Sequence, residues 1–204
     1  AAPWRPDPVH AQDYHDARSV EEPAASYVRG GHIADVSHYG HPGTATWAEA
    51  RDRGNTVYLP GHTVHMLPPV LAETVCSLVP HEDRLAHTVE MHLDKEDLGY
   101  DEIDIYKSVI RSDARLTYTQ CENILDDPAA AEEFLEDPEL LEEVGLGAKN
   151  RLIWELAEEM HEQRKADGSL VLNPRRDRAH TIIEECMLKD NKAVTHELMW
   201  TRRV

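Results

Sequence analysis

The chain changes from alternating apolar and polar positions in its first half to helical spacing in its second half. Alternation bounded by turn residues predicts four strands, at 32–39, 56–59, 87–93 and 103–110. A short helix is expected from Thr46 to Arg53, because Gly54 follows it as a stop signal. Residues 1–30 contain four prolines, and the glycine pair Gly30-Gly31 falls at their end, which predicts irregular structure.

Beyond Leu116 the apolar residues recur at the spacing of helices. Helices are predicted at about 148–166 and 178–200, with a short strand at 170–172 between them and a solvated acidic insertion at 126–143. The inward faces are expected to carry Leu152, Ile153, Leu156, Met160, Ile182, Ile183, Cys186, Met187, Val194 and Leu198. The pattern therefore predicts an α/β or α+β fold, in which helices of the second half pack on a mixed sheet of the first half.

A length of 204 residues favours one domain over two, strand-rich over 1–115 and mainly helical over 116–204. No apolar run is long enough to predict a membrane span, and no signal-peptide pattern opens the sequence. Three widely spaced cysteines, Cys76, Cys121 and Cys186, indicate buried thiols in a reducing compartment, so we expect a cytoplasmic protein.

The net charge of −18 argues against a nucleic-acid partner, because phosphate contacts normally come from Lys and Arg. A uniformly acidic surface is also an adaptation to high salt, and we therefore hypothesise a halophilic host.

The segment 7–17, DPVHAQDYHDA, concentrates candidate chemistry. Asp7, Asp13 and Asp16 stand with His10 and His15 in a stretch too irregular for a regular helix. Clustered carboxylates raise each other's pKa unless a cation neutralises them, and oxygen ligands favour Mg²⁺. Such a site suits phosphodiester hydrolysis. The alternative is a solvated acidic loop.

Together with this segment, a series of motifs resembles the catalytic domain of the ribonuclease II/ribonuclease R family, closest to the ribonuclease R branch. The motifs are IADVSHY (33–39), GNTVYLP (54–60), MLPPVLAETVCSL (66–78), DRLAHTVEM (83–91), SDARLTY (112–118) and AHTIIEECM (179–187). The resemblance covers nearly the whole chain. It implies an α/β catalytic domain that hydrolyses single-stranded RNA from its 3′ end, with Mg²⁺ or Mn²⁺ as cofactor.

The resemblance assigns metal binding and catalysis to Asp7, Asp13 and Asp16. The fourth acidic position of the family is His15 here. A neutral imidazole is a poor Mg²⁺ ligand, so activity is either lost or shifted towards Mn²⁺ or Zn²⁺. A third interpretation is a transition-metal hydrolase that uses His10 and His15.

The resemblance also implies that Tyr58 stacks on a terminal base, and that either Glu184 or Glu185 is an active-site glutamate. Tyr118 and Asn191 are the further RNA-binding candidates. A second clamp aromatic, expected near 170–172, is missing from the sequence. The family's catalytic domain continues beyond Val204. We therefore expect that the chain either is joined to the remainder of that domain or needs a partner subunit. A non-catalytic relative, acting as a structural or RNA-binding subunit, is the main alternative to a nuclease.

Overall fold

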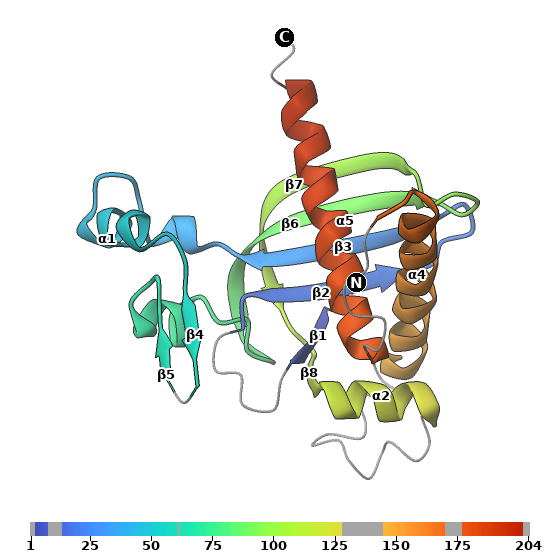
Figure 1. Cartoon of the computed structure of the whole chain (residues 1–204), viewed down its shortest axis with the longest axis horizontal. Helices are drawn as coiled ribbons and strands as arrows, with labels where there is room; N and C mark the ends of the chain where they lie inside the picture. Colours follow the sequence, from blue (N-terminus) through green and yellow to red (C-terminus); the bar gives the residue numbers. More distant parts are fainter. Residues whose placement is uncertain (1–2, 8–13, 61, 128–144, 170–176, 202–204) are drawn as a thin grey trace.

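A six-stranded mixed sheet forms the centre of the protein (Figure 1). The computed structural model describes residues 3–7, 14–60, 62–127, 145–169 and 177–201, apart from the side chains of Arg5, Asp7, Trp200 and Thr201. The strands, in spatial order, are β7 (Tyr100–Arg111), β6 (Asp83–Asp94), β3 (Ser26–Ala34), β2 (Asp16–Glu21), β1 (Trp4–Asp7) and β8 (Ala114–Thr117). Only the pair β1–β8 is parallel among them.

Helices of the second half cover one face of this sheet, as the sequence predicts (Figure 1). Helix α5 (Arg178–Thr201) crosses the sheet, and α4 (Leu146–Ala166) lies next to α5. Helix α2 (Tyr118–Asp126) begins directly after β8. On the side away from α4, a small lobe carries α1 (Ala45–Arg53) and the hairpin of β4 (Val57–Leu59) and β5 (His62–Val64).

Three hydrophobic clusters fix the sheet to its coverings in the described part of the chain, and one of them packs Val89, Met91 and Leu93 of β6 against Ala193 of α5. The other two differ in size. The larger joins one end of the sheet to α2, α4 and α5 and includes Trp4, Leu116, Ile124, Ile153, Leu156 and Ile182. The smaller, under the segment 70–78, includes Ala17, Ala34, Cys76, Leu78, Ala86 and Ile110. All three cysteines are buried free thiols, as predicted.

The expectation of irregular structure over residues 1–30 is wrong, because β1, β2 and the start of β3 lie there. Pro6 is tolerated because β1 pairs with β2 only at Trp4 and Arg18, so the missing N–H removes no bond on that side. Gly31 lies within β3, where a Cβ atom would come within 2.6 Å of the Asp190 carboxylate on α5. The glycine permits this close approach rather than a turn.

The predicted strand at 32–39 is also misplaced. β3 ends at Ala34, because Asp35 begins a 3-10 turn, Val36–His38, and accepts a hydrogen bond from the His38 N–H at 3.1 Å. The π-helix Val70–Val75 and the strand β5 are not predicted from the sequence. Leu198 is 57 % exposed rather than inward, since α5 extends beyond the edge of the sheet there (Figure 1). The strand predicted at 170–172 lies outside the described residues.

A buried ion pair ties α5 to the middle of the sheet. The Arg29 guanidinium of β3 donates to both Asp190 carboxylate oxygens, at 2.7 and 3.1 Å. Burial lowers the pKa of Arg29, but the charge and hydrogen bonds of Asp190 outweigh that effect and raise it. Asp190, which interrupts the apolar stripe of α5 in the sequence, is therefore a satisfied buried carboxylate.

A chain of hydrogen bonds crosses four strands beside this pair. Ser108 Oγ donates to the Ala86 carbonyl, so it accepts from Thr88 Oγ1 at 2.6 Å. Thr88 in turn accepts from His32 Nδ1 at 2.9 Å, which leaves His32 Nε2 to accept from Ser19 Oγ. Burial lowers the pKa of His32 to about 4, so the imidazole is neutral at physiological pH.

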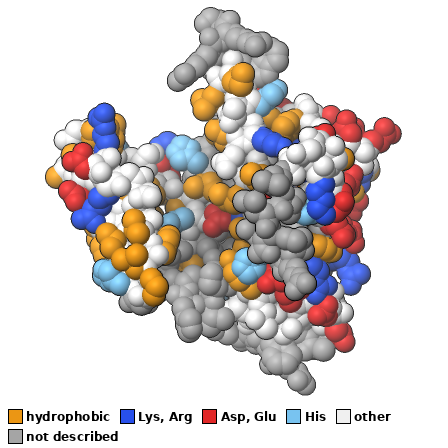
Figure 2. Space-filling view, in the orientation of Figure 1, with side chains coloured by type: hydrophobic (Ala, Val, Ile, Leu, Met, Phe, Trp, Pro, Cys, Tyr) orange, Lys and Arg blue, Asp and Glu red, His pale blue; other side chains and the backbone are white. Residues whose placement is uncertain are grey.

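Acidic side chains gather over α4 and the neighbouring strand turns, whereas apolar side chains gather on the β4–β5 hairpin (Figure 2). On the hairpin, Val57, Tyr58 and Leu59 are 44 %, 67 % and 52 % exposed. Within the described part of the chain, no helix is both long and apolar enough to span a membrane.

Candidate functional site

Several candidate residues lie where three neighbouring strands end or begin. β1 ends at Asp7, which is paired in register with Thr117 at the end of β8. β2 runs antiparallel to β1 and begins at Asp16. The fold therefore brings the backbone of Asp7 and the start of β2 to one edge of the sheet. Residues 8–13, which include His10 and Asp13, lie outside the described residues, as does the side chain of Asp7.

Asp16 is held by an arginine of its own strand. Its Oδ2 accepts from the Arg18 guanidinium at 2.6 Å, and the two residues share one face of β2 because they are two positions apart. Arg18 is 2 % exposed. Burial lowers the pKa of Arg18, but the negative charge of Asp16 and of other neighbours raises it overall. A cation bound at Asp16 would therefore share the carboxylate with a permanent positive charge.

His15 is turned onto the π-helix. Its Nε2 lies 2.8 Å from the carbonyl oxygen of Ala72. A carbonyl can only accept, so Nε2 carries the hydrogen, and Nδ1 is the nitrogen that could ligate a metal or accept a proton. The neighbouring residue strengthens the same junction, because Leu78 N donates to the Tyr14 carbonyl at 2.7 Å and Tyr14 N donates to Ser77 Oγ at 3.3 Å.

Carboxylate oxygens at adjacent strand ends are a donor set that suits Mg²⁺ or Mn²⁺. Among the side chains that the structure describes, no group of three His, Cys, Asp or Glu could hold a metal ion. Since the Asp7 side chain and the whole of Asp13 are not among them, the three-aspartate cluster stays a prediction.

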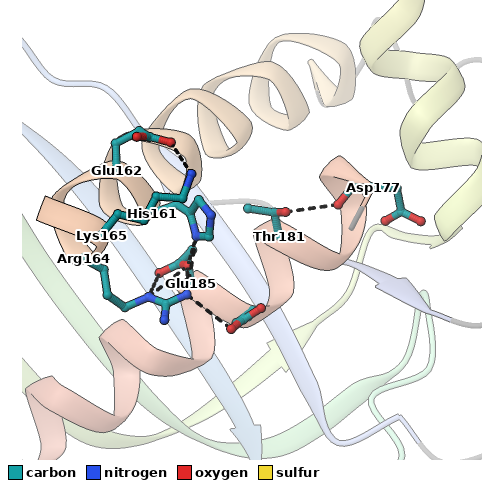
Figure 3. A network of polar contacts seen from close by, with 8 residues as sticks. His161, Glu162, Arg164, Lys165, Asp177, Thr181 and Glu185 are labelled. Atoms are coloured by element: carbon teal, nitrogen blue, oxygen red, sulfur yellow. Dashed lines mark hydrogen bonds and ion pairs between the residues drawn. The ribbon is translucent and has the colours of Figure 1, made fainter. Parts of the chain in front are cut away.

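Glu184 and Glu185 differ in their surroundings on α5. Figure 3 shows Glu185 facing His161 and Arg164 of α4. Glu185 is 3 % exposed and accepts from His161 Nδ1 and from Arg164, each at 2.6 Å. Burial raises the pKa of Glu185, but the hydrogen bonds and charge of these two α4 residues lower it overall. The Glu184 side chain is 31 % exposed and lies 3.3 Å from Arg164. Glu185 thus fastens α5 to α4, and Glu184 is the more accessible carboxylate.

The three RNA-binding candidates lie on different elements. Tyr58 is an exposed residue of β4, in the lobe away from α4 (Figure 1). Tyr118 begins α2 and packs against His180 of α5, with ring centroids 4.2 Å apart. Asn191 is exposed on α5. Their joint role in RNA binding therefore stays a prediction.

Sequence reasoning missed Arg18 as a partner of Asp16 and Ala72 as a partner of His15. The first carried a usable signal, since an arginine two positions from an aspartate in a strand shares its face. The second carried none, because a backbone carbonyl 57 residues away has no side-chain signature.

Comparison with known proteins places this chain in a family. The RNB domain matches residues 6–202. Ribonuclease R of Aquifex aeolicus is 39% identical over 204 residues, which covers 94% of this chain and 29% of that protein. Mycoplasma genitalium RNase R, in complex with ribose methylated single-stranded RNA, superposes with a TM-score of 0.86 at 25% identity, over 98% of this chain and 33% of the other.

Two Arabidopsis thaliana proteins show that a match to this region does not by itself indicate catalysis. One is named DIS3-like exonuclease 2 and the other Inactive exonuclease DIS3L2. Each is 43% identical over 123 residues, covering 59% of this chain and 11% of its own length. The chain thus spans less than a third of the Aquifex relative and still less of these two.

Proposed function

Because the chain belongs to the RNB domain family, we propose that it is the metal-binding segment of a hydrolytic 3′→5′ exoribonuclease that degrades single-stranded RNA to nucleoside 5′-monophosphates. The observation that carries the proposal is the family match across 6–202, combined with a sheet edge where Asp7 ends one strand and Asp16 begins its neighbour.

In this proposal Asp7, Asp13 and Asp16 hold a divalent cation, Mg²⁺ or Mn²⁺. The cation supplies polarisation of the scissile phosphate and lowers the pKa of water. Arg18 orients the Asp16 carboxylate and limits the negative charge of the cluster. Tyr58 offers an exposed ring for stacking on a base, which tolerates any sequence. Glu184 offers the accessible carboxylate of α5, while Glu185 keeps the two helices together.

The test is incubation of the protein at high salt with 5′-labelled single-stranded RNA and Mg²⁺, Mn²⁺ or Zn²⁺ in turn. Shortening of the RNA from its 3′ end with Mg²⁺ or Mn²⁺ is expected, and Asp13→Asn should abolish it. Glu22→Gln is the matched control, because it removes one carboxylate from an exposed ion pair with Lys95 and should leave activity unchanged. Hydrolysis that survives Asp13→Asn would refute the assignment of the metal site.

A second candidate function is that of an RNA-binding subunit without hydrolytic activity. His15 favours it, because an imidazole that donates to the Ala72 carbonyl brings no negative charge to the cluster. RNA that is bound but intact with every metal ion, and that is hydrolysed by the His15→Asp variant, would favour this function over the first. Hydrolysis only with Zn²⁺ would instead favour a transition-metal hydrolase.

A further inference from the structure

The β4–β5 hairpin has little packing of its own. Each strand has three residues, and all except Thr63 among the six are exposed. An isolated two-stranded hairpin is marginally stable in water, so the position of this one depends on contacts at its base.

Those contacts lead to residue 65 and the chain beside it. The Arg53 guanidinium of α1 donates to the His65 carbonyl at 2.9 Å, and Met66 N donates to Thr56 Oγ1 at 3.1 Å. The His65 imidazole is largely buried, and its Nε2 lies 3.0 Å from Glu73 Oε1. Glu73 belongs to the π-helix, so the hairpin is joined to that helix by a side-chain contact.

Ala72, the residue before Glu73 in the π-helix, is hydrogen-bonded to His15. Ala72 lies in a helix of only six residues, whose last carbonyl groups have no N–H partner within the helix. His15 supplies a donor to one of them at 2.8 Å. Glu73 and Ala72 thus fasten the same short helix to the hairpin on one side and to the sheet edge on the other. Single π-helical turns of this kind occur frequently at functional sites.

We propose that His15 is a positioning residue, which fixes the Tyr58-bearing hairpin through Ala72 and Glu73, rather than a metal ligand. The hydrogen bond requires a donor at position 15, which a carboxylate cannot provide. The consequence for RNA rests on the proposed function, because it assumes that Tyr58 contacts the substrate.

Hydrogen exchange followed by mass spectrometry tests the anchor without RNA or metal. In His15→Ala and His15→Asp, peptides covering 57–66 should exchange roughly three to ten times faster than in the wild type, the range set by one ordinary hydrogen bond. His15→Gln should retain protection, because its amide can still donate to Ala72. Exchange in β6 should not change, and His92→Ala, which removes a part-exposed imidazole elsewhere, is the matched control.

Acceleration confined to 70–78, with the hairpin at its wild-type rate, would overturn the proposal. A His15→Asp variant as well protected as His15→Gln would also overturn it, since a carboxylate cannot donate to the Ala72 carbonyl and the protection would then not depend on this hydrogen bond. If His15→Ala also unfolds the sheet, Glu73→Gln replaces it in the test, because this variant weakens the contact between the π-helix and His65 and leaves His15 unchanged. The same faster exchange of the peptides covering 57–66 is then expected.

A second measurement separates the anchor from the role of Tyr58. The RNA for this measurement carries a fluorescent 2-aminopurine at its 3′ end and is bound in the presence of a chelator. Its fluorescence should be quenched less by the His15→Ala protein than by the His15→Gln protein. Tyr58→Ala should abolish the difference between those two backgrounds. If hydrogen exchange in the hairpin becomes faster but the fluorescence quenching does not change, the positioning role of His15 is supported and the contact of Tyr58 with RNA is refuted.

Discussion

Removal of Asp190 should destabilise the protein far more than removal of both members of its ion pair. Arg29 is 0 % exposed and Asp190 6 % exposed, and two hydrogen bonds join them. In Asp190→Ala the guanidinium stays buried without its counter-charge, which typically costs about 3–5 kcal/mol. That is a large part of the roughly 5–15 kcal/mol by which a domain is usually stable.

The double variant Arg29→Met/Asp190→Ala removes both charges and should be more stable than Asp190→Ala alone, because replacing a buried pair by apolar groups is often nearly neutral. The free energy of unfolding is measured by urea denaturation at constant salt, with circular dichroism as the probe and the two single variants completing the cycle. A cost below about 1 kcal/mol for Asp190→Ala, or strict additivity of the two single variants, would refute the reasoning.

Three further predictions concern the same region and the surface. His32 has a pKa near 4 in the folded protein and 6.5 in the unfolded chain, so the unfolded chain binds a proton more readily between these two pH values. The free energy of unfolding should therefore fall by about 3 kcal/mol as the pH drops from 6.5 to 4. In urea unfolding at a series of pH values, His32→Gln should remove this part of the pH dependence. Gly31→Ala should lower the melting temperature of the wild type, because the new Cβ would lie 2.6 Å from the Asp190 carboxylate. The decrease should be smaller in the Asp190→Ala background, and thermal unfolding of the wild type, the two single variants and the double variant measures both values. With a net charge of −18, the melting temperature should rise when sodium chloride is increased from 0.1 M to 2 M, and a flat response would remove the halophile hypothesis.

Local sequence signals predict the helices α1, α4 and α5 and the strands β6 and β7 well, but they miss α2 and the π-helix Val70–Val75. Helix α1 ends where Gly54 adopts a left-handed conformation with φ of 76°. The residues predicted to face inward on α4 and α5 are buried or half-buried, apart from the exposed Leu198. The strands β6 and β7 occupy and extend the predicted ranges, because their alternation is supported by antiparallel pairing along most of their length.

The strand β1 and the start of β3 could not be predicted, because the proline and glycines in them have long-range explanations. Pro6 is compatible with β1 only through the way that β1 diverges from β2, and Gly31 is explained by a carboxylate on the last helix. The acidic segment and its resemblance indicate the kind of site, whereas the contacts of His15 and Asp190 depend on partners that only the fold brings near.

The most direct test of the metal-binding claim is the stoichiometry of Mn²⁺ binding, measured by isothermal titration calorimetry and by the loss of the free-ion electron paramagnetic resonance signal. We predict one Mn²⁺ per chain in the wild type, lost in Asp13→Asn and in Asp16→Asn and retained in Glu22→Gln. Binding that is absent from the wild type, or unchanged when both aspartates are replaced, would contradict the account.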